Sequence, residues 1–253
     1  MAQISLYQQF RSVCSSDRVD SYRSGEGETE IDVFARYVWN TTLCESLYPS
    51  LQNLEIGLRN RLNDALAGSY GYDEWYTDTS IVLDVSARNK VIEAKQLIQD
   101  EGKTVTPSRV VSELSLGFWT SLFSAQHHEA IWERPGLLKD AFPYMPKTIR
   151  KRSTLAGRFG EARKLRNRIF HFEPIWRRAN LAGEHANVIE ALGWLDPCLQ
   201  KVTAAIDRFK EVNTQDHRDL IRDRLVRACP VESKLLIASR RSLTTEEVLV
   251  SAK

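Results

Sequence analysis

Apolar residues recur every three or four positions along most of the chain, and the alternating patterns typical of strands are hard to find. Only 12 glycines and 8 prolines interrupt this pattern. The sequence therefore predicts an all-α fold. We expect helices over residues 32–47, 49–68, 87–99, 107–128, 147–173, 184–212 (kinked at Pro197) and 216–228.

Irregular segments separate the expected helices, and residues 1–23 have room for one short helix. The aromatic stretch 69–85 predicts a loop with an extended piece, and the proline-rich stretch 131–146 predicts a connection. A chain of 253 residues suits one large domain or two small ones. Because no repeat or marked boundary is visible, we expect a single domain over 1–253, with an N-terminal extension (1–30) and a C-terminal tail (230–253).

The expected helix 147–173 has two different faces. At about 100° per residue, its apolar residues form one stripe that should face the core. Asn167 and His171 are four residues apart and therefore lie side by side, about 160–200° away from Ile169. His171 is thus not expected to be a core histidine, although the pattern fits a merely solvated histidine equally well. The apolar stripe contains Leu155, Phe159, Ala162, Leu165, Ile169, Phe172 and Trp176.

Positive charge is concentrated on the same helix, although the net charge of the whole chain is only +2. Nine lysines and arginines fall within 22 positions, against Glu161 as the only acid. Such a stripe suits the phosphate backbone of RNA, whereas the plainer interpretation is a solvated helix paired with acidic neighbours. The candidate RNA-binding residues are Lys147, Arg150, Lys151, Arg152, Arg158, Arg163 and Lys164.

Arg166, Asn167 and His171 form the candidate catalytic set. Imidazole can both take and give a proton near neutral pH, and RNA cleavage by its own 2′-hydroxyl needs both transfers. A planar guanidinium suits the extra negative charge on a transition-state phosphate. An asparagine amide both donates and accepts hydrogen bonds, so it can orient the histidine or a phosphate oxygen.

The sequence Arg166-Asn167-x-x-x-His171 near a helix end resembles the R-x(4–6)-H signature of the HEPN superfamily, in which a polar residue follows the arginine. Three longer stretches are similar, in matching order, to the Abi-like (abortive infection) branch of that superfamily. They are LYPSLQNLEIGLRNRLNDAL (47–66), SELSLGFWTSLFS (112–124) and LRNRIFHFEPIW (165–176).

This resemblance implies a HEPN-like helical bundle with additional peripheral helices, commonly a homodimer and a metal-independent ribonuclease of phage defence. Two copies of the motif would face each other, which answers a geometric difficulty, because Arg166 and His171 lie about 140° apart on one helix. Phe170 would then be an exposed interface residue. The implied reaction leaves a 2′,3′-cyclic phosphate, with His171 as general acid or base, Arg166 stabilising the phosphorane and Asn167 orienting the groups.

Glu55, Arg59 and Asn60, on the leucine-rich helix 49–68, are possible supporting residues. Glu55 and Arg59 have the i,i+4 spacing of a surface ion pair. The alternative is that Glu55 or Asn60 braces the motif from a neighbouring helix.

Outside the candidate catalytic set, the histidines and cysteines form no recognisable catalytic or metal-binding pattern. His127 and His128 are adjacent, lack metal-ligand spacing and are expected to be solvated, whereas Phe118 and Trp119 are expected in the core. We expect no metal and no cofactor. The four cysteines (Cys14, Cys44, Cys198 and Cys229) are scattered and are expected to be free thiols.

The N-terminus lacks the apolar segment of a signal peptide, and no stretch approaches the roughly 18 apolar residues of a membrane span. The sequence therefore predicts a cytoplasmic protein. Besides the nuclease, two hypotheses stay open. One is a non-catalytic RNA-binding module that needs the basic helix but not His171. The other is a toxin component held by an antitoxin, a regulatory RNA or another partner.

Overall fold

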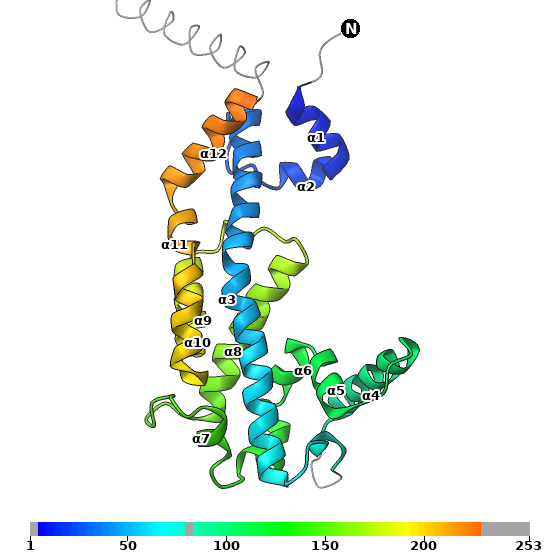
Figure 1. The fold of residues 1–253 in the computed structure, drawn as a ribbon. Coiled ribbons are helices and arrows are strands. Elements are labelled where there is room, and N and C mark those ends of the chain that lie inside the picture. Colours follow the sequence, from blue (N-terminus) through cyan, green and yellow to red (C-terminus); the bar gives the residue numbers. More distant parts are fainter. Residues whose placement is uncertain (1–4, 79–82, 229–253) are drawn as a thin grey trace, which may run out of the picture. The chain divides into compact units, whose positions relative to one another are not determined.

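The structure is a computed structural model that describes residues 5–78 and 83–228, and every regular element in these ranges is helical, which confirms the all-α prediction (Figure 1). The α-helices are α1 (Leu6–Cys14), α2 (Ser16–Asp20), α3 (Glu30–Tyr70), α4 (Val85–Asp100), α5 (Pro107–Glu113), α6 (Leu116–Ser121), α7 (Leu137–Ala141), α8 (Arg152–Phe170), α9 (Leu181–Leu195), α10 (Pro197–Ile206), α11 (Phe209–Val212) and α12 (Gln215–Ala228). Short 3₁₀ turns, η1 (Trp75–Thr77) and η2 (Ala125–His127), and a π-helical turn, η3 (His128–Trp132), complete the set.

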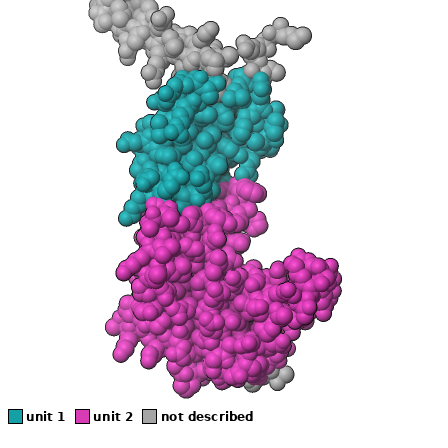
Figure 2. All heavy atoms as spheres, viewed as in Figure 1, with its two compact units in different colours: residues 1–46, 174–178, 208–253 teal, residues 47–173, 179–207 magenta. Residues whose placement is uncertain are grey.

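The chain divides into two compact units, coloured separately in Figure 2. Unit 1 contains residues 1–46, 174–178 and 208–253, and unit 2 contains residues 47–173 and 179–207. The single-domain expectation stays a prediction, because a compact unit need not fold independently. All the candidate site residues belong to unit 2.

Unit 1 joins segments that are distant in the sequence through buried polar contacts. The side-chain oxygen of Asn40 accepts hydrogen bonds from the backbone N–H groups of Ile175 (2.8 Å) and Trp176 (3.2 Å). Trp39 Nε1 donates to the carbonyl of Val212 at 2.8 Å. The aromatic and aliphatic core of this unit includes Tyr7, Val19, Tyr22, Ile31, Val33 and Phe34.

Unit 2 is built on two apolar helix faces that the sequence pattern identifies. The leucines of α3 at positions 47, 51, 54, 58 and 62 are buried, as are Leu155, Phe159, Ala162, Leu165 and Ile169 of α8. Phe159 stacks on Phe123 at 5.6 Å between ring centroids. Phe118 and Trp119 are fully buried, as expected.

Helix α3 runs through Pro49, where the sequence predicted a new helix. A proline inside a helix costs about 3 kcal/mol because its ring clashes and it lacks an N–H donor. Burying one leucine is worth about 1.5–3 kcal/mol, and an unbroken helix keeps the whole leucine series on one face. The helix also continues past Gly68 and ends before Gly71, whose φ of +85° suits glycine at a helix terminus.

Two other expected helices are broken. Residues 107–128 divide into α5 and α6 because Leu114 is extended (φ −72°, ψ 118°). Residues 184–212 divide at Asp196, whose carboxylate accepts from the N–H groups of Cys198 (2.7 Å) and Leu199 (3.2 Å) and so starts a separate helix at Pro197. The expected connection 131–146 contains α7, and residues 1–23 hold two helices rather than one.

The basic helix is shorter than predicted at both ends. It begins at Arg152 rather than near Lys147, because Lys151 has extended backbone angles (φ −135°, ψ 144°). It ends at Phe170 rather than near Glu173. Among the described helices, none has both the length and the apolarity needed to cross a bilayer. The tail 230–253 and Cys229 lie outside the described residues.

Candidate functional site

The candidate site lies at the C-terminal end of α8, where the chain turns sharply. The N–H of Glu173 donates to the carbonyl of Arg168 (2.8 Å), and the N–H of Phe172 donates to that of Ile169 (3.0 Å). This pair of bonds is the Schellman pattern of helix termination. Phe172 takes the left-handed position in it, with φ of +59°. The turn places His171 as the last, capping residue of the helix.

Asn167 and His171 are both exposed, as the sequence predicted for the polar face of this helix. The backbone N–H of His171 donates to the carbonyl of Asn167 at 2.9 Å, which keeps the two residues on adjacent turns. Phe172 was expected in the buried stripe, but 70% of it is exposed. The left-handed turn reverses the chain at this residue, so helical spacing no longer fixes the direction of its side chain.

The left-handed Phe172 provides a stability test. Non-glycine side chains are strained in this conformation, so Phe172→Gly is expected to raise the free energy of unfolding by about 0.5–1 kcal/mol. Urea denaturation of the purified protein measures this. Phe172→Leu removes the ring but keeps a side chain, so it should show no such gain. A glycine variant no more stable than wild type would mean that contacts of the phenylalanine outweigh its backbone strain.

Arg166 is held from two directions. Its Nε atom is buried and lies 3.4 Å from Oε2 of Glu55, and its guanidinium carbon lies 4.3 Å from the ring centre of Phe170. The other carboxylate oxygen of Glu55 accepts from the backbone N–H of Leu116 at 3.0 Å. Phe170 is 42% exposed and packs on Tyr48, with ring centroids 5.9 Å apart. The structure thus brings Glu55 to Arg166.

The other two supporting candidates point elsewhere. Arg59 donates to Oδ1 of Asn60 (3.3 Å) and to the carbonyl of Ser112 (3.4 Å). Among the described residues, it forms no ion pair with Glu55. Glu55 and Arg59 therefore hold the two sides of the break between α5 and α6, one through Leu116 and the other through Ser112.

Several of the predicted RNA-binding arginines form hydrogen bonds within the protein itself. Arg150 donates to the carbonyls of Met145 and Pro143, and Arg152 donates to the carbonyl of Phe123. Arg158 also contacts unit 2 itself, through the carboxylate of Glu190 and the carbonyl of Asn187. Lys164 pairs with Glu161 at 2.8 Å, and Arg163 is half-buried. Lys147 and Lys151 are exposed, so the basic surface is narrower than the sequence predicted.

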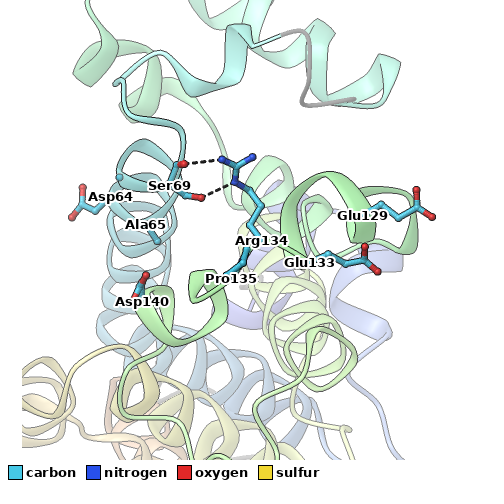
Figure 3. Close-up of a pocket in the computed structure, with 9 residues that line it drawn as sticks. Asp64, Ala65, Ser69, Glu129, Glu133, Arg134, Pro135 and Asp140 are labelled. Atoms are coloured by element: carbon cyan, nitrogen blue, oxygen red, sulfur yellow. Dashed lines mark hydrogen bonds between the residues drawn. The ribbon is translucent and has the colours of Figure 1, made fainter.

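The structure also contains a cavity of about 800 Å³ elsewhere in unit 2 (Figure 3). Arg134 projects into this region and donates to the side chain and the carbonyl of Ser69, each at 2.7 Å. Its lining includes four acids, Asp64, Glu129, Glu133 and Asp140. None of the candidate site residues lines it. An acidic wall repels a phosphate backbone, so this cavity does not suit a nucleic-acid ligand.

His127 is fully buried, so the prediction of a solvated residue is wrong for it. Its Nε2 accepts from the N–H of Asp84 at 3.2 Å, and its Nδ1 lies 3.1 Å from both Ser124 Oγ and the carbonyl of Ser121. These partners satisfy the hydrogen-bonding capacity of both ring nitrogens of the buried histidine, and no pattern in the sequence predicts them. His128 is exposed, as predicted.

In the described part of the chain, no group of three or more His, Cys, Asp or Glu side chains is arranged to hold a metal ion. Cys14, Cys44 and Cys198 are free thiols. Burial raises the pKa of the Cys44 thiol to about 11. Comparison of the chain with family models, curated proteins and solved structures found no match.

Proposed function

We propose that the chain is a metal-independent endoribonuclease of the HEPN superfamily, from its Abi-like branch, acting in the cytoplasm of a bacterium during abortive infection. The observation that carries this proposal is the end of α8, where the exposed Asn167 directly follows Arg166, which pairs with Glu55, and the exposed His171 lies one turn beyond Asn167. General acid–base chemistry needs an accessible imidazole, and this one is accessible.

The reaction follows from the residue types. The 2′-hydroxyl of the RNA loses a proton and attacks the adjacent phosphorus, while the bond from phosphorus to the 5′-oxygen breaks. His171 transfers one of the two protons involved, either from the 2′-oxygen or to the leaving 5′-oxygen, and solvent water carries the other. Arg166 stabilises the extra charge of the phosphorane. Asn167 orients the imidazole or a phosphate oxygen. The products carry a 2′,3′-cyclic phosphate and a 5′-hydroxyl.

A second copy of the chain supplies the missing half of this site. Arg166 and His171 lie about 140° apart around one helix, so a two-fold pair brings one copy's histidine to the other's arginine. The exposed rings of Tyr48 and Phe170, beside Arg166, give this face apolar area for such a contact. An antitoxin or a regulatory RNA that covers the same surface would silence the enzyme.

The second candidate function is RNA binding without cleavage, which the exposed Lys147 and Lys151 favour. These two lysines are the appropriate residues to substitute in a test of RNA binding. Arg150 and Arg152 are unsuitable because they donate hydrogen bonds to backbone carbonyls, so their loss would disturb the fold. A binding module loses affinity in the Lys147→Ala/Lys151→Ala variant and shows steep salt dependence, yet produces no cleaved ends.

The deciding experiment is RNA cleavage by the purified protein in EDTA. We expect cleavage to continue at the rate seen without chelator, because imidazole and guanidinium supply the acid–base and electrostatic chemistry. End-group analysis should find 2′,3′-cyclic phosphates and 5′-hydroxyls. Loss of cleavage in EDTA, or products with 3′-hydroxyl ends, would contradict the proposed mechanism. Binding without any cleavage would instead support the second candidate.

A further inference from the structure

Arg166 has neighbours on one edge and one face of its guanidinium. The Nε atom is buried, makes no hydrogen bond and lies 3.4 Å from Oε2 of Glu55, while the guanidinium carbon lies over the Phe170 ring, 4.3 Å from its centre. The two Nη atoms form no hydrogen bond to the described residues and are not among the buried, unsatisfied atoms there. The open edge of Arg166 is therefore the one that carries both Nη atoms.

We infer that Glu55 and Phe170 are positioning residues that fix Arg166 so that its two-Nη edge faces an incoming phosphate. This inference rests on the proposed nuclease function and explains how the guanidinium of Arg166 is oriented toward the phosphate. A guanidinium binds phosphate best through two parallel N–H groups, which requires a fixed plane. The carboxylate restrains the guanidinium by charge attraction at the Nε end, and the ring restrains it by cation–π contact.

The carboxylate is itself held in place. One oxygen of Glu55 takes the N–H of Leu116 at 3.0 Å, so the other oxygen cannot rotate freely away from Arg166. The ring of Phe170 is supported by Tyr48 at 5.9 Å. The side chains of Arg166 and Glu55 are 28% and 24% exposed, which limits solvent screening of the pair. Both contacts of the guanidinium thus rest on packed neighbours.

The alternative is that Glu55 inhibits the reaction. The two roles predict opposite changes in the rate of RNA cleavage when the carboxylate is removed. A carboxylate that merely neutralises Arg166 lowers its attraction for phosphate, so removing the charge would speed cleavage and tighten RNA binding. A carboxylate that positions Arg166 helps the transition state, so removing it slows the chemical step with little effect on RNA binding.

The test is the Glu55→Gln variant, whose amide oxygen can still accept from the N–H of Leu116. We expect kcat for RNA cleavage to fall about tenfold and KM to stay within about threefold of wild type. Glu113→Gln is the matched control, because Glu113 is an exposed acid on α5 and its loss changes the net charge equally. An unchanged or raised kcat in Glu55→Gln would overturn the inference.

Phe170 is tested by two replacements of similar bulk. Phe170→Leu keeps apolar volume but removes the aromatic face, and we expect kcat to fall about threefold. Phe170→Tyr keeps the face and should restore the wild-type kcat. If the leucine and tyrosine variants cleave equally well, the ring does not position the arginine.

A readout independent of cleavage separates this inference from the nuclease proposal. The readout is the NMR signal of the Arg166 Nε–H, which is assigned by its absence from the spectrum of Arg166→Lys. This proton should exchange with solvent several-fold faster in Glu55→Gln than in wild type or Glu113→Gln. Binding of a short 2′-O-methylated RNA, which lacks the attacking hydroxyl, should broaden or shift the Nη signals in wild type. If His171→Ala cleaves normally, the nuclease proposal fails, while unchanged Nε–H exchange rejects the positioning role by itself.

Discussion

Replacing His171 with alanine is expected to lower the rate of RNA cleavage about a thousandfold, because general acid–base catalysis contributes about 10²–10⁴-fold. His171 is exposed at the last position of α8, so its removal leaves the buried stripe intact and should not unfold the protein. RNA affinity should change little, since the exposed lysines near the start of α8 are untouched. Single-turnover cleavage with excess protein measures the chemical step directly.

The control for this experiment is His128→Ala. His128 is also exposed but lies on η3, outside the candidate site, so its replacement should leave the cleavage rate at the wild-type value. A His171→Ala protein that cleaves as fast as wild type would remove the imidazole from the mechanism. In that case the basic end of α8 would be interpreted as an RNA-binding surface.

The sequence predicted the buried stripe of α8 well because helical periodicity alone determines it. Leu155, Phe159, Leu165 and Ile169 are buried as the 100° rule requires. The prediction failed at Phe172, one residue beyond the helix cap, where the backbone is left-handed. Periodicity applies only while the helix continues, and a phenylalanine at the position usually taken by glycine gave no warning of the turn.

Helix boundaries were less predictable because tertiary contacts compete with local signals. Pro49 is a strong local signal for a helix start, yet the buried leucines on both sides of it favour one continuous helix. The break at Leu114 is stabilised from outside, since Glu55 accepts the N–H of Leu116 and Arg59 donates to the carbonyl of Ser112. Such contacts join residues more than fifty positions apart, so local patterns do not contain them.

In the candidate site, too, helical periodicity predicted some features, whereas contacts between residues distant in the sequence were not predictable. The exposure of Asn167 and His171 follows from their place on the helix, and it was predicted. That Glu55 or Asn60 braces the motif from a neighbouring helix was only one of two alternatives, because the i,i+4 spacing favoured a surface pair of Glu55 with Arg59, whereas Glu55 pairs with Arg166. The use of Arg150 and Arg152 as donors to backbone carbonyls was not predictable, since charge patterning counts lysines and arginines without knowing which carbonyls need partners.

A composite site made from two copies predicts recovery of activity when two inactive variants are paired. Arg166→Ala and His171→Ala homodimers should each cleave at least a hundredfold more slowly than wild type. In a mixed dimer, the first copy still has its histidine and the second still has its arginine. One of the two histidine–arginine combinations is then intact, so cleavage should return to about half the wild-type rate.

Co-expression of the two variants with different affinity tags, followed by purification through both, isolates the mixed dimer for this measurement. The decisive control pairs a wild-type copy with an Arg166→Ala/His171→Ala copy. If each histidine works with the arginine of the other copy, this control is inactive, although one chain in it is fully intact. If each histidine works with its own Arg166, the control keeps half the activity and the mixed dimer of single variants stays inactive. A protein that remains monomeric while cleaving RNA would exclude the composite site, because its activity would then need no arginine or histidine from a second copy.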